Sequence, residues 1–188
     1  MGDAVAHPAP YTVDDLYALP DDGMRHELLD GTLLVSPPPA VAHQLAAGRL
    51  VDVLSRAAPA DIEVLEATGV ELPAGLLVPD VVVAAAPAVH RAGRTLATAD
   101  VRAVVEIVSP SSRRADRTWK PEAYAEGGIA TYWRVELDAP GGAEVVAFSL
   151  GAAGYARVAH ARAGAVTLLP EPFPVALDPA WLSGPLRR

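Results

Sequence analysis

The chain has 188 residues, of which 51% are hydrophobic and 20% are charged, and its formal net charge is −8. The apolar fraction is ample for one folded core, whereas two independent domains would each be small. The absence of cysteine excludes disulfides and thiolate zinc sites, and the acidic charge argues against a broad, non-specific nucleic-acid surface.

No apolar run in the sequence reaches membrane-spanning length, and the N-terminus lacks the basic region and apolar core of a signal peptide. We therefore expect a cytoplasmic protein with no membrane partner. Residues 1–10 are rich in alanine and proline without periodicity and predict a flexible tail. Residues 11–188 are expected to form a single domain.

Two short elements are expected near the N-terminus. Residues 12–15 form a capping-box pattern, which predicts a short helix. Residues 25–35 then predict two strands joined at Asp30-Gly31, a strong signal for a tight hairpin turn. Glu27 lies in the first strand, where one interpretation is an exposed position paired with Arg25 or another neighbour.

The longest helical pattern covers residues 40–58 and follows three prolines. His43 and Gln44 lie at its start. Taken alone, a histidine in that position is more often a helix-start residue with a local hydrogen bond than a functional group. The apolar positions expected on the buried face are Val41, Leu45, Leu50, Val53 and Leu54.

Two later strands each contain one acidic residue among apolar ones: Asp80 opens the first, and Glu106 lies within the second. The polar residues 85–100 between them predict a loop with a short helix. Burial of an ionised carboxylate costs several kcal/mol unless it has a partner. Two such carboxylates, with Lys120 on the following segment, suit a divalent-metal phosphodiesterase site. Structural ion pairs explain the same spacing equally well.

The segment after Glu106 is the one locally basic part of the sequence. Arg113, Arg114, Arg117 and the single lysine, Lys120, lie where a phosphate backbone could pass. A solvated loop that balances the acidic remainder is the alternative interpretation.

A second helix is expected over residues 118–126. Asp116, Lys120 and Tyr124 are spaced four apart, so a continuous helix would align them on one face. Pro121 is compatible only with the first turn of a helix, so the helix would begin at Thr118 or later, with Lys120 in its first turn or just outside it.

The remaining residues predict strands. Residues 129–135 form one of them, in which Tyr132 and Trp133 are expected to pack in the core. Short strands separated by glycine turns follow between residues 144 and 177, which predicts an antiparallel C-terminal extension of the central sheet.

Taken together, these motifs resemble the PD-(D/E)XK nuclease superfamily and, within it, the Uma-two (Uma2) family of restriction-endonuclease-like proteins. The resemblance extends from about residue 11 to residue 177. The superfamily lysine usually follows the glutamate by two residues, a position held here by Val108, whereas Lys120 stands at the place that matches the Uma2 family. The matching positions are Arg25 to Leu33, His43-Gln44, Pro79-Asp80, Glu106 to Ser112, Asp116, Lys120, Tyr124, Gly127 and Tyr132-Trp133.

The resemblance implies an α+β fold with a restriction-endonuclease-like core, in which a mixed central β-sheet is flanked by helices. It also implies a Mg²⁺- or Mn²⁺-dependent endonuclease. Asp80, Glu106 and the Ile107 carbonyl would hold the metal, and Lys120 would act with the two carboxylates in catalysis. Residues placed near this site by the resemblance are Glu27, His43, Gln44, Asp116 and Tyr124.

Two function classes remain open. The first is a nuclease acting on nucleic acid, expected to be DNA, as a homodimer that brings two sites to opposite strands. The second is a catalytically degenerate, homo-oligomeric interaction module of the same fold. In that case Lys120 would be an exposed helix-start residue whose loss has little effect.

Overall fold

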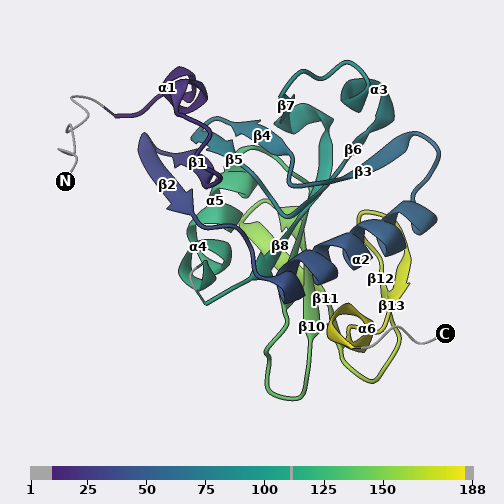
Figure 1. Cartoon of the computed structure of the whole chain (residues 1–188). Coiled ribbons are helices and arrows are strands. Elements are labelled where there is room, and N and C mark those ends of the chain that lie inside the picture. Colours follow the sequence, from purple (N-terminus) through teal and green to yellow (C-terminus); the bar gives the residue numbers. More distant parts are fainter. Residues whose placement is uncertain (1–9, 111, 185–188) are drawn as a thin grey trace.

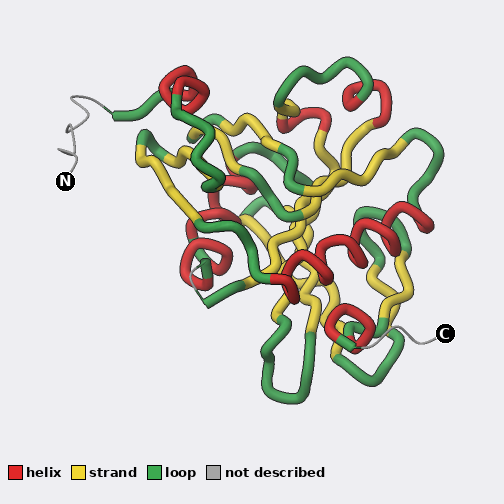
Figure 2. Tube along the Cα trace, viewed as in Figure 1, coloured by secondary structure: helices red, strands yellow, loops and turns green. Residues whose placement is uncertain are grey.

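The computed structural model describes residues 10–110 and 112–184, so the expected tail lies almost entirely outside the described residues. Strands in this part of the chain form three sheets, with helices packed around them (Figures 1 and 2). None of the helices described there has both the length and the apolar character needed to span a membrane.

The first sheet contains the predicted N-terminal hairpin, with strand order β2-β1-β5-β4-β7. Asp30 and Gly31 form the turn with φ values of 48° and 71°, a geometry that an Asp-Gly pair tolerates. Strand β7 was not expected within the predicted loop, because three residues are too few to show alternation. The members are β1 (Arg25–Leu29), β2 (Thr32–Ser36), β4 (Gly69–Leu72), β5 (Gly75–Leu77) and β7 (Thr95–Ala97).

The central sheet is mixed, with strand order β11-β10-β9-β8-β6-β3. Strands β8 and β9 pair in parallel and the other neighbours are antiparallel. Strands β10 and β11 provide the expected antiparallel extension, but β12 (Thr167–Leu169) and β13 (Val175–Leu177) pair separately. The six strands are β3 (Ile62–Glu66), β6 (Val81–Ala85), β8 (Val101–Val108), β9 (Thr131–Glu136), β10 (Glu144–Gly151) and β11 (Gly154–Arg162).

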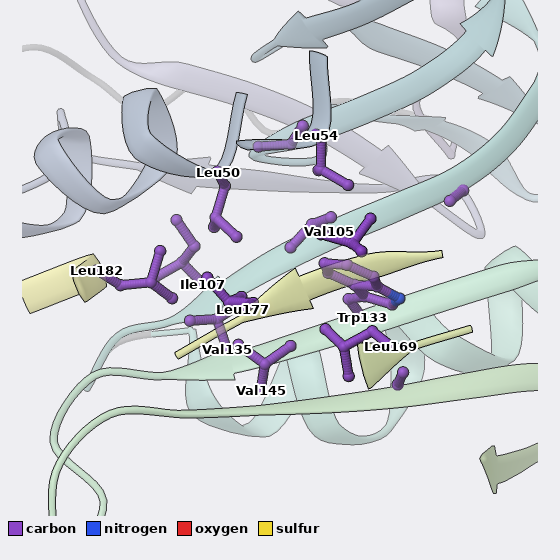
Figure 3. Close-up of a cluster of buried hydrophobic side chains, with 14 of the residues drawn as sticks. Leu50, Leu54, Val105, Ile107, Trp133, Val135, Val145, Leu169, Leu177 and Leu182 are labelled. Atoms are coloured by element: carbon purple, nitrogen blue, oxygen red, sulfur yellow. The ribbon is translucent and has the colours of Figure 1, made fainter. Parts of the chain in front are cut away.

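One face of the central sheet packs against the long helix α2, as Figure 3 shows. Leu50 and Leu54 of α2 are fully buried there with Trp133 of β9. The prediction that Val41 and Leu45 share this face was wrong, because they are 81% and 46% exposed. In the first turn of α2, His43 contacts the Ile107 carbonyl of β8 and lines a cavity, whereas Val41 and Leu45 are turned away from the sheet.

The opposite face of the central sheet packs against helix α5 and the first sheet. Val82 and Val104 point toward this face. Side chains alternate along a strand, so Asp80 and Glu106 lie on the same face as these two valines. The helices are α1 (Val13–Ala18), α2 (Val41–Ala57), α3 (Ala86–Val89), α4 (Arg113–Arg117), α5 (Trp119–Glu126) and α6 (Ala180–Ser183), with a 3₁₀ turn, η1, at Thr98–Asp100.

Candidate active site

Asp80 directly precedes β6 and Glu106 lies in β8, and these two strands are antiparallel neighbours. Val81 of β6 is opposite Val105 of β8. The backbone N–H of Ile107 donates a 2.8 Å hydrogen bond to Asp80 Oδ2. The strand pairing therefore fixes the Asp80 carboxylate beside the backbone that carries Glu106.

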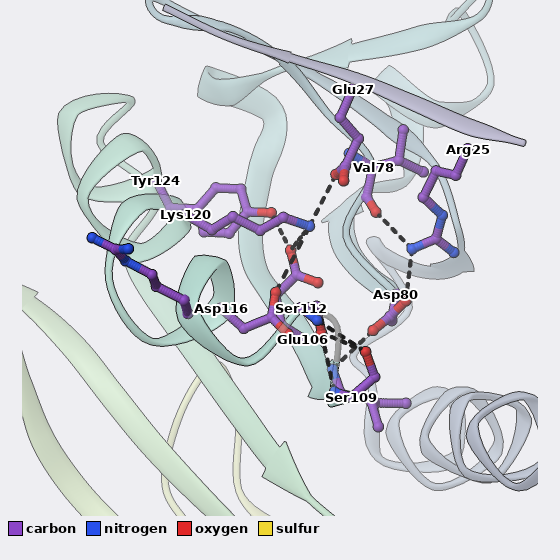
Figure 4. Close-up of polar contacts among 12 residues, drawn as sticks. Arg25, Glu27, Val78, Asp80, Glu106, Ser109, Ser112, Asp116, Lys120 and Tyr124 are labelled. Carbon is purple, nitrogen blue, oxygen red and sulfur yellow. Dashed lines mark hydrogen bonds and ion pairs between the residues drawn. The ribbon is translucent and has the colours of Figure 1, made fainter. Parts of the chain in front are cut away.

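Lys120 joins this pair to the first sheet (Figure 4). Its Nζ lies 3.0 Å from Glu27 Oε1 and 3.1 Å from Glu106 Oε1. The Tyr124 hydroxyl, one turn further along α5, donates to the same Glu106 oxygen. Four side chains from β1, β8 and α5 thus form one buried cluster, and the structure brings Glu27, Lys120 and Tyr124 together as expected.

Glu27 and Glu106 each use only one carboxylate oxygen, Oε1, in their hydrogen bonds and ion pairs. Glu27 Oε1 also accepts the backbone N–H of Val78 at 2.8 Å. Neither Glu27 Oε2 nor Glu106 Oε2 has a hydrogen-bond or ion-pair partner among the described residues. Both residues line a cavity of about 640 Å³ that Asp80, Ile107 and Lys120 also line.

Asp80 has its own partners, a guanidinium and an imidazole. Arg25 Nη1 lies 2.9 Å from Asp80 Oδ1, and His43 Nε2 lies 3.1 Å from Asp80 Oδ2. The same His43 nitrogen is 3.1 Å from the Ile107 carbonyl oxygen. Burial raises the pKa of Asp80, but His43, the Ile107 N–H and Arg25 together hold it below its usual value.

The two buried groups at the centre of the cluster have strongly perturbed pKa values. Burial raises the pKa of Glu106 well above its usual value, although Lys120 opposes the shift. Burial alone lowers the pKa of Lys120, but Glu106, Glu27 and Asp116 raise it above its usual value. Lys120 is therefore an ammonium ion at every pH at which the protein is expected to work.

The helix that carries Lys120 is interrupted. Thr118 has φ −129° and ψ −76°, which separates α4 from α5 and places Pro121 in the first turn of α5. The helix therefore begins where Pro121 predicted, Asp116 and Lys120 do not share a continuous helix, and Asp116 Oδ1 still lies 3.9 Å from Lys120 Nζ. Both Asp116 oxygens are buried without a hydrogen-bond partner in the described part of the chain.

The remaining candidates lie outside this cluster. Gln44 is exposed and does not line the cavity. Arg117 is paired with Glu136 at 2.8 Å, and Arg114 lies over the Trp119 ring, 5.2 Å from its centroid. Arg113 lines a separate pocket beside Arg117. The three arginines thus contribute no side chain to the cavity wall, which Lys120 of the same segment does line.

A structural ion pair of Asp80 with an arginine was one interpretation of the sequence, but the sequence did not identify Arg25 as that arginine. Arg25 and Glu27 are two residues apart on β1, so their side chains share a face, and both reach the cavity. This two-residue spacing was the signal in the sequence that Arg25 and Glu27 reach the same site. It could not name Asp80 as the partner, because the pairing of β1 with β5 connects residues far apart in the chain.

The donor set suits a hard divalent cation. Carboxylate and carbonyl oxygens are the ligands that Mg²⁺ prefers, and it commonly keeps several waters. Across residues 10–110 and 112–184, no three His, Asp or Glu side chains converge closely enough to hold an ion by themselves. Any ion here would therefore combine few protein ligands with water.

This fold and this site together define a restriction-endonuclease-like protein. A solved structure described as "a putative nuclease belonging to DUF820", from Anabaena variabilis, matches with a TM-score of 0.67. The match covers 87% of this chain and 90% of that chain at 17% identity. At this identity the match concerns the fold alone, and it confirms the expected fold class.

A family model described as "Putative restriction endonuclease" matches residues 13–182. The chain therefore belongs to the Uma2 family, which confirms the resemblance found in the sequence. No curated protein matches the chain.

The buried carboxyl of Asp116 predicts a pH-dependent effect of Asp116→Asn. Burial raises the pKa of Asp116 from 3.8 to about 6, against the lowering effect of Lys120. The folded state therefore favours the protonated carboxyl, and this contribution is lost as pH rises through about 6. A pKa difference of this size corresponds to about 3 kcal/mol.

Urea unfolding of wild type and Asp116→Asn from pH 4 to pH 8 measures this effect. The variant should gain stability relative to wild type as pH rises, by up to about 3 kcal/mol. A stability difference that stays constant over this range would show that Asp116 is ionised throughout.

Proposed function

We propose that the protein is a divalent-metal-dependent endonuclease that hydrolyses phosphodiester bonds in nucleic acid. The observation that carries the proposal is the buried ammonium of Lys120, 3.1 Å from Glu106 in a cavity that Asp80 also lines. Membership in a family described as "Putative restriction endonuclease" supports the same reaction class.

In this proposal Asp80, Glu106 and the Ile107 carbonyl hold Mg²⁺ or Mn²⁺. The chemistry such an ion supplies is a water of lowered pKa and neutralisation of phosphate charge. Lys120 and Tyr124 both donate to Glu106 Oε1, which leaves Oε2 available as a ligand.

The other polar groups of the cavity position the reacting ones. Arg25 donates to Asp80 and to the Val78 carbonyl, so it holds the Asp80 carboxylate in place. Glu27 holds Lys120 from the opposite side of the cavity. The Lys120 ammonium can donate a further hydrogen bond to the attacking water or to a phosphate oxygen.

A catalytically degenerate interaction module remains the second candidate. The observation that favours it is that Arg25, His43 and Lys120 already partner the carboxylates a metal would need. The structure nevertheless corrects one part of that alternative: Lys120 is 4% exposed, so it is not an exposed helix-start residue.

The metal assignment predicts a thermal shift. Mg²⁺ or Mn²⁺ at a hundredfold excess over its Kd should stabilise the folded protein by about 3 kcal/mol through mass action. Asp80→Asn should lose this gain. Asp52→Asn, which changes an exposed carboxylate on α2, is the matched control and should retain it. Equal shifts in wild type and Asp80→Asn would contradict the shared metal site.

We propose DNA as the substrate and a homodimer as the working form. The chain has a net charge of −8 and one lysine, so a monomer offers few contacts to a phosphate backbone. A twofold pair would double the contacts made by Arg113 and Arg114, which are exposed beside the cavity. Light scattering at micromolar concentration should return twice the mass of the chain, and a monomer mass would remove this support.

Plasmid nicking in Mn²⁺ tests the proposed reaction. Wild type should nick DNA, and Glu106→Gln and Lys120→Gln should each abolish nicking. Removing one partner of a buried charge pair often costs 3–5 kcal/mol, so folding is checked by circular dichroism. Arg49→Gln removes a buried cation outside the cavity, held by the Trp181 and Gly184 carbonyls, and controls for lost stability.

Three outcomes separate the candidates. Nicking that Arg49→Gln keeps and both active-site variants lose supports the metal-and-lysine mechanism. Nicking that survives in Lys120→Gln but not in Glu106→Gln removes Lys120 from the reaction. Absence of cleavage of DNA and RNA by wild type in every divalent metal favours the interaction module.

A further inference from the structure

Trp119 lies between the candidate active site and a second cavity. Its side chain lines the 640 Å³ cavity beside Lys120 and also lines an adjoining cavity of about 360 Å³. Leu34 of β2 is the other residue common to both. Trp119 is 40% exposed, in contrast to the fully buried Trp133. A large aromatic ring is thus accessible at the border of the two cavities.

The second cavity is formed by the β1–β2 hairpin and α5, which lie beside each other in Figure 1. Its walls are mainly apolar, and carboxylates of Asp30, Glu122 and Glu126 lie at its edge. None of these three side-chain carboxylates has a hydrogen-bond or ion-pair partner within the described part of the chain, although the backbone N–H groups of Asp30 and Glu122 do. The apolar lining residues are Leu29, Leu34, Ala74, Trp119 and Ala123.

We propose that this second cavity, together with Trp119, binds one unpaired nucleobase next to the phosphodiester in the active site. The inference rests on the proposed nuclease function, because it assigns the strand that site would hold. A base stacks on an aromatic ring regardless of its sequence. The carboxylates can accept hydrogen bonds from the N–H and amino groups of the base.

The two cavities differ in the charged side chains that line them. The second cavity contains carboxylates and no cationic side chain in its wall, so it repels phosphate. Carboxylates of Glu27, Asp80, Glu106 and Asp116 line the larger cavity as well, but it also holds the cations of Arg25 and Lys120, which can contact a phosphate and which the second cavity lacks. Arg114 lies over the Trp119 ring and places a third cation near the border. A strand that crosses the border would therefore place its phosphate beside Lys120 and its base beyond Trp119.

This arrangement selects for an unpaired nucleotide, either in a single strand or turned out of a duplex at the site of cleavage. A base in a duplex is stacked and paired, and it reaches a separate pocket only after leaving the helix. The acidic rim would suit a small organic cation equally well, but such a ligand would not need the neighbouring phosphate-attracting cavity. Single-stranded DNA and RNA share the stacked base, and the 2′-hydroxyl distinguishes them.

Binding without metal isolates this pocket from catalysis. Binding is measured in EDTA with a fluorescein-labelled single-stranded oligodeoxynucleotide, the RNA of the same sequence, and the blunt DNA duplex. Anisotropy gives the affinity of every variant, including those that lack Trp119, and tryptophan fluorescence of the wild type reports stacking. The single strands should quench the fluorescence and bind more tightly than the duplex. Trp119→Ala should weaken single-strand binding by about 5- to 100-fold, and Trp119→Phe by much less. Trp181→Phe, which changes a tryptophan packed beside Arg49, is the control and should bind as wild type.

An abasic substitution series supplies the second measurement. Removing one base of the oligonucleotide should weaken binding to wild type as much as Trp119→Ala does, and should have no further effect on that variant. Additive effects, unchanged affinity of Trp119→Ala, or quenching by spermidine but by no oligonucleotide would overturn the base pocket.

The outcomes also separate this inference from the proposed reaction. Base-dependent binding by a protein that cleaves nothing keeps the pocket and removes the nuclease function. Cleavage with wild-type KM by Trp119→Ala keeps the nuclease function and removes the pocket.

Discussion

The burial of one ammonium between two carboxylates is the constraint on which the rest of the structure depends. Lys120 of α5 contacts Glu27 of the first sheet and Glu106 of the central sheet, and all three side chains are at most 5% exposed. The free-energy cost of desolvating such charges is offset only when the ion-pair geometry and the hydrogen bonding are good. The two sheets and the helix must therefore meet at one relative position, and loss of any partner leaves an unpaired buried charge.

The same contacts explain why a cavity persists beside the cluster. Tyr124 and Lys120 bind one oxygen of Glu106, and Arg25, His43 and the Ile107 N–H bind Asp80. Each carboxylate is thus oriented by groups behind it, while apolar packing continues on the other face of the sheet. A cation bound to Asp80 and the Ile107 carbonyl would have to replace their contacts with His43, whereas Lys120 and Tyr124 could keep Glu106 in place.

Local patterns predicted much of this arrangement. Asp80 and Glu106 were predicted as site residues because each is a single acidic residue in an apolar strand. Pro121 correctly indicated that α5 could begin only shortly before it. Patterns could not show which strands pair over long distances, so the separate first sheet, strand β7 and the Arg25–Asp80 contact required the structure. Periodicity also assigned Val41 to the buried face, because it gives the direction of a side chain but not which positions the rest of the chain covers. No signal in the sequence pointed to Trp119, because the exposure of its side chain depends on a hairpin that is distant in sequence.

Anomalous scattering from a crystal soaked in Mn²⁺ tests the central claim most directly, because it locates the ion independently of any activity. The account predicts that the strongest peak lies in the larger cavity, within bonding distance of Asp80, Glu106 and the Ile107 carbonyl. It also predicts that Lys120 remains hydrogen-bonded to Glu106 in that crystal. A map with no peak in this cavity at millimolar Mn²⁺, or with the ion bound only at surface carboxylates, would contradict the account.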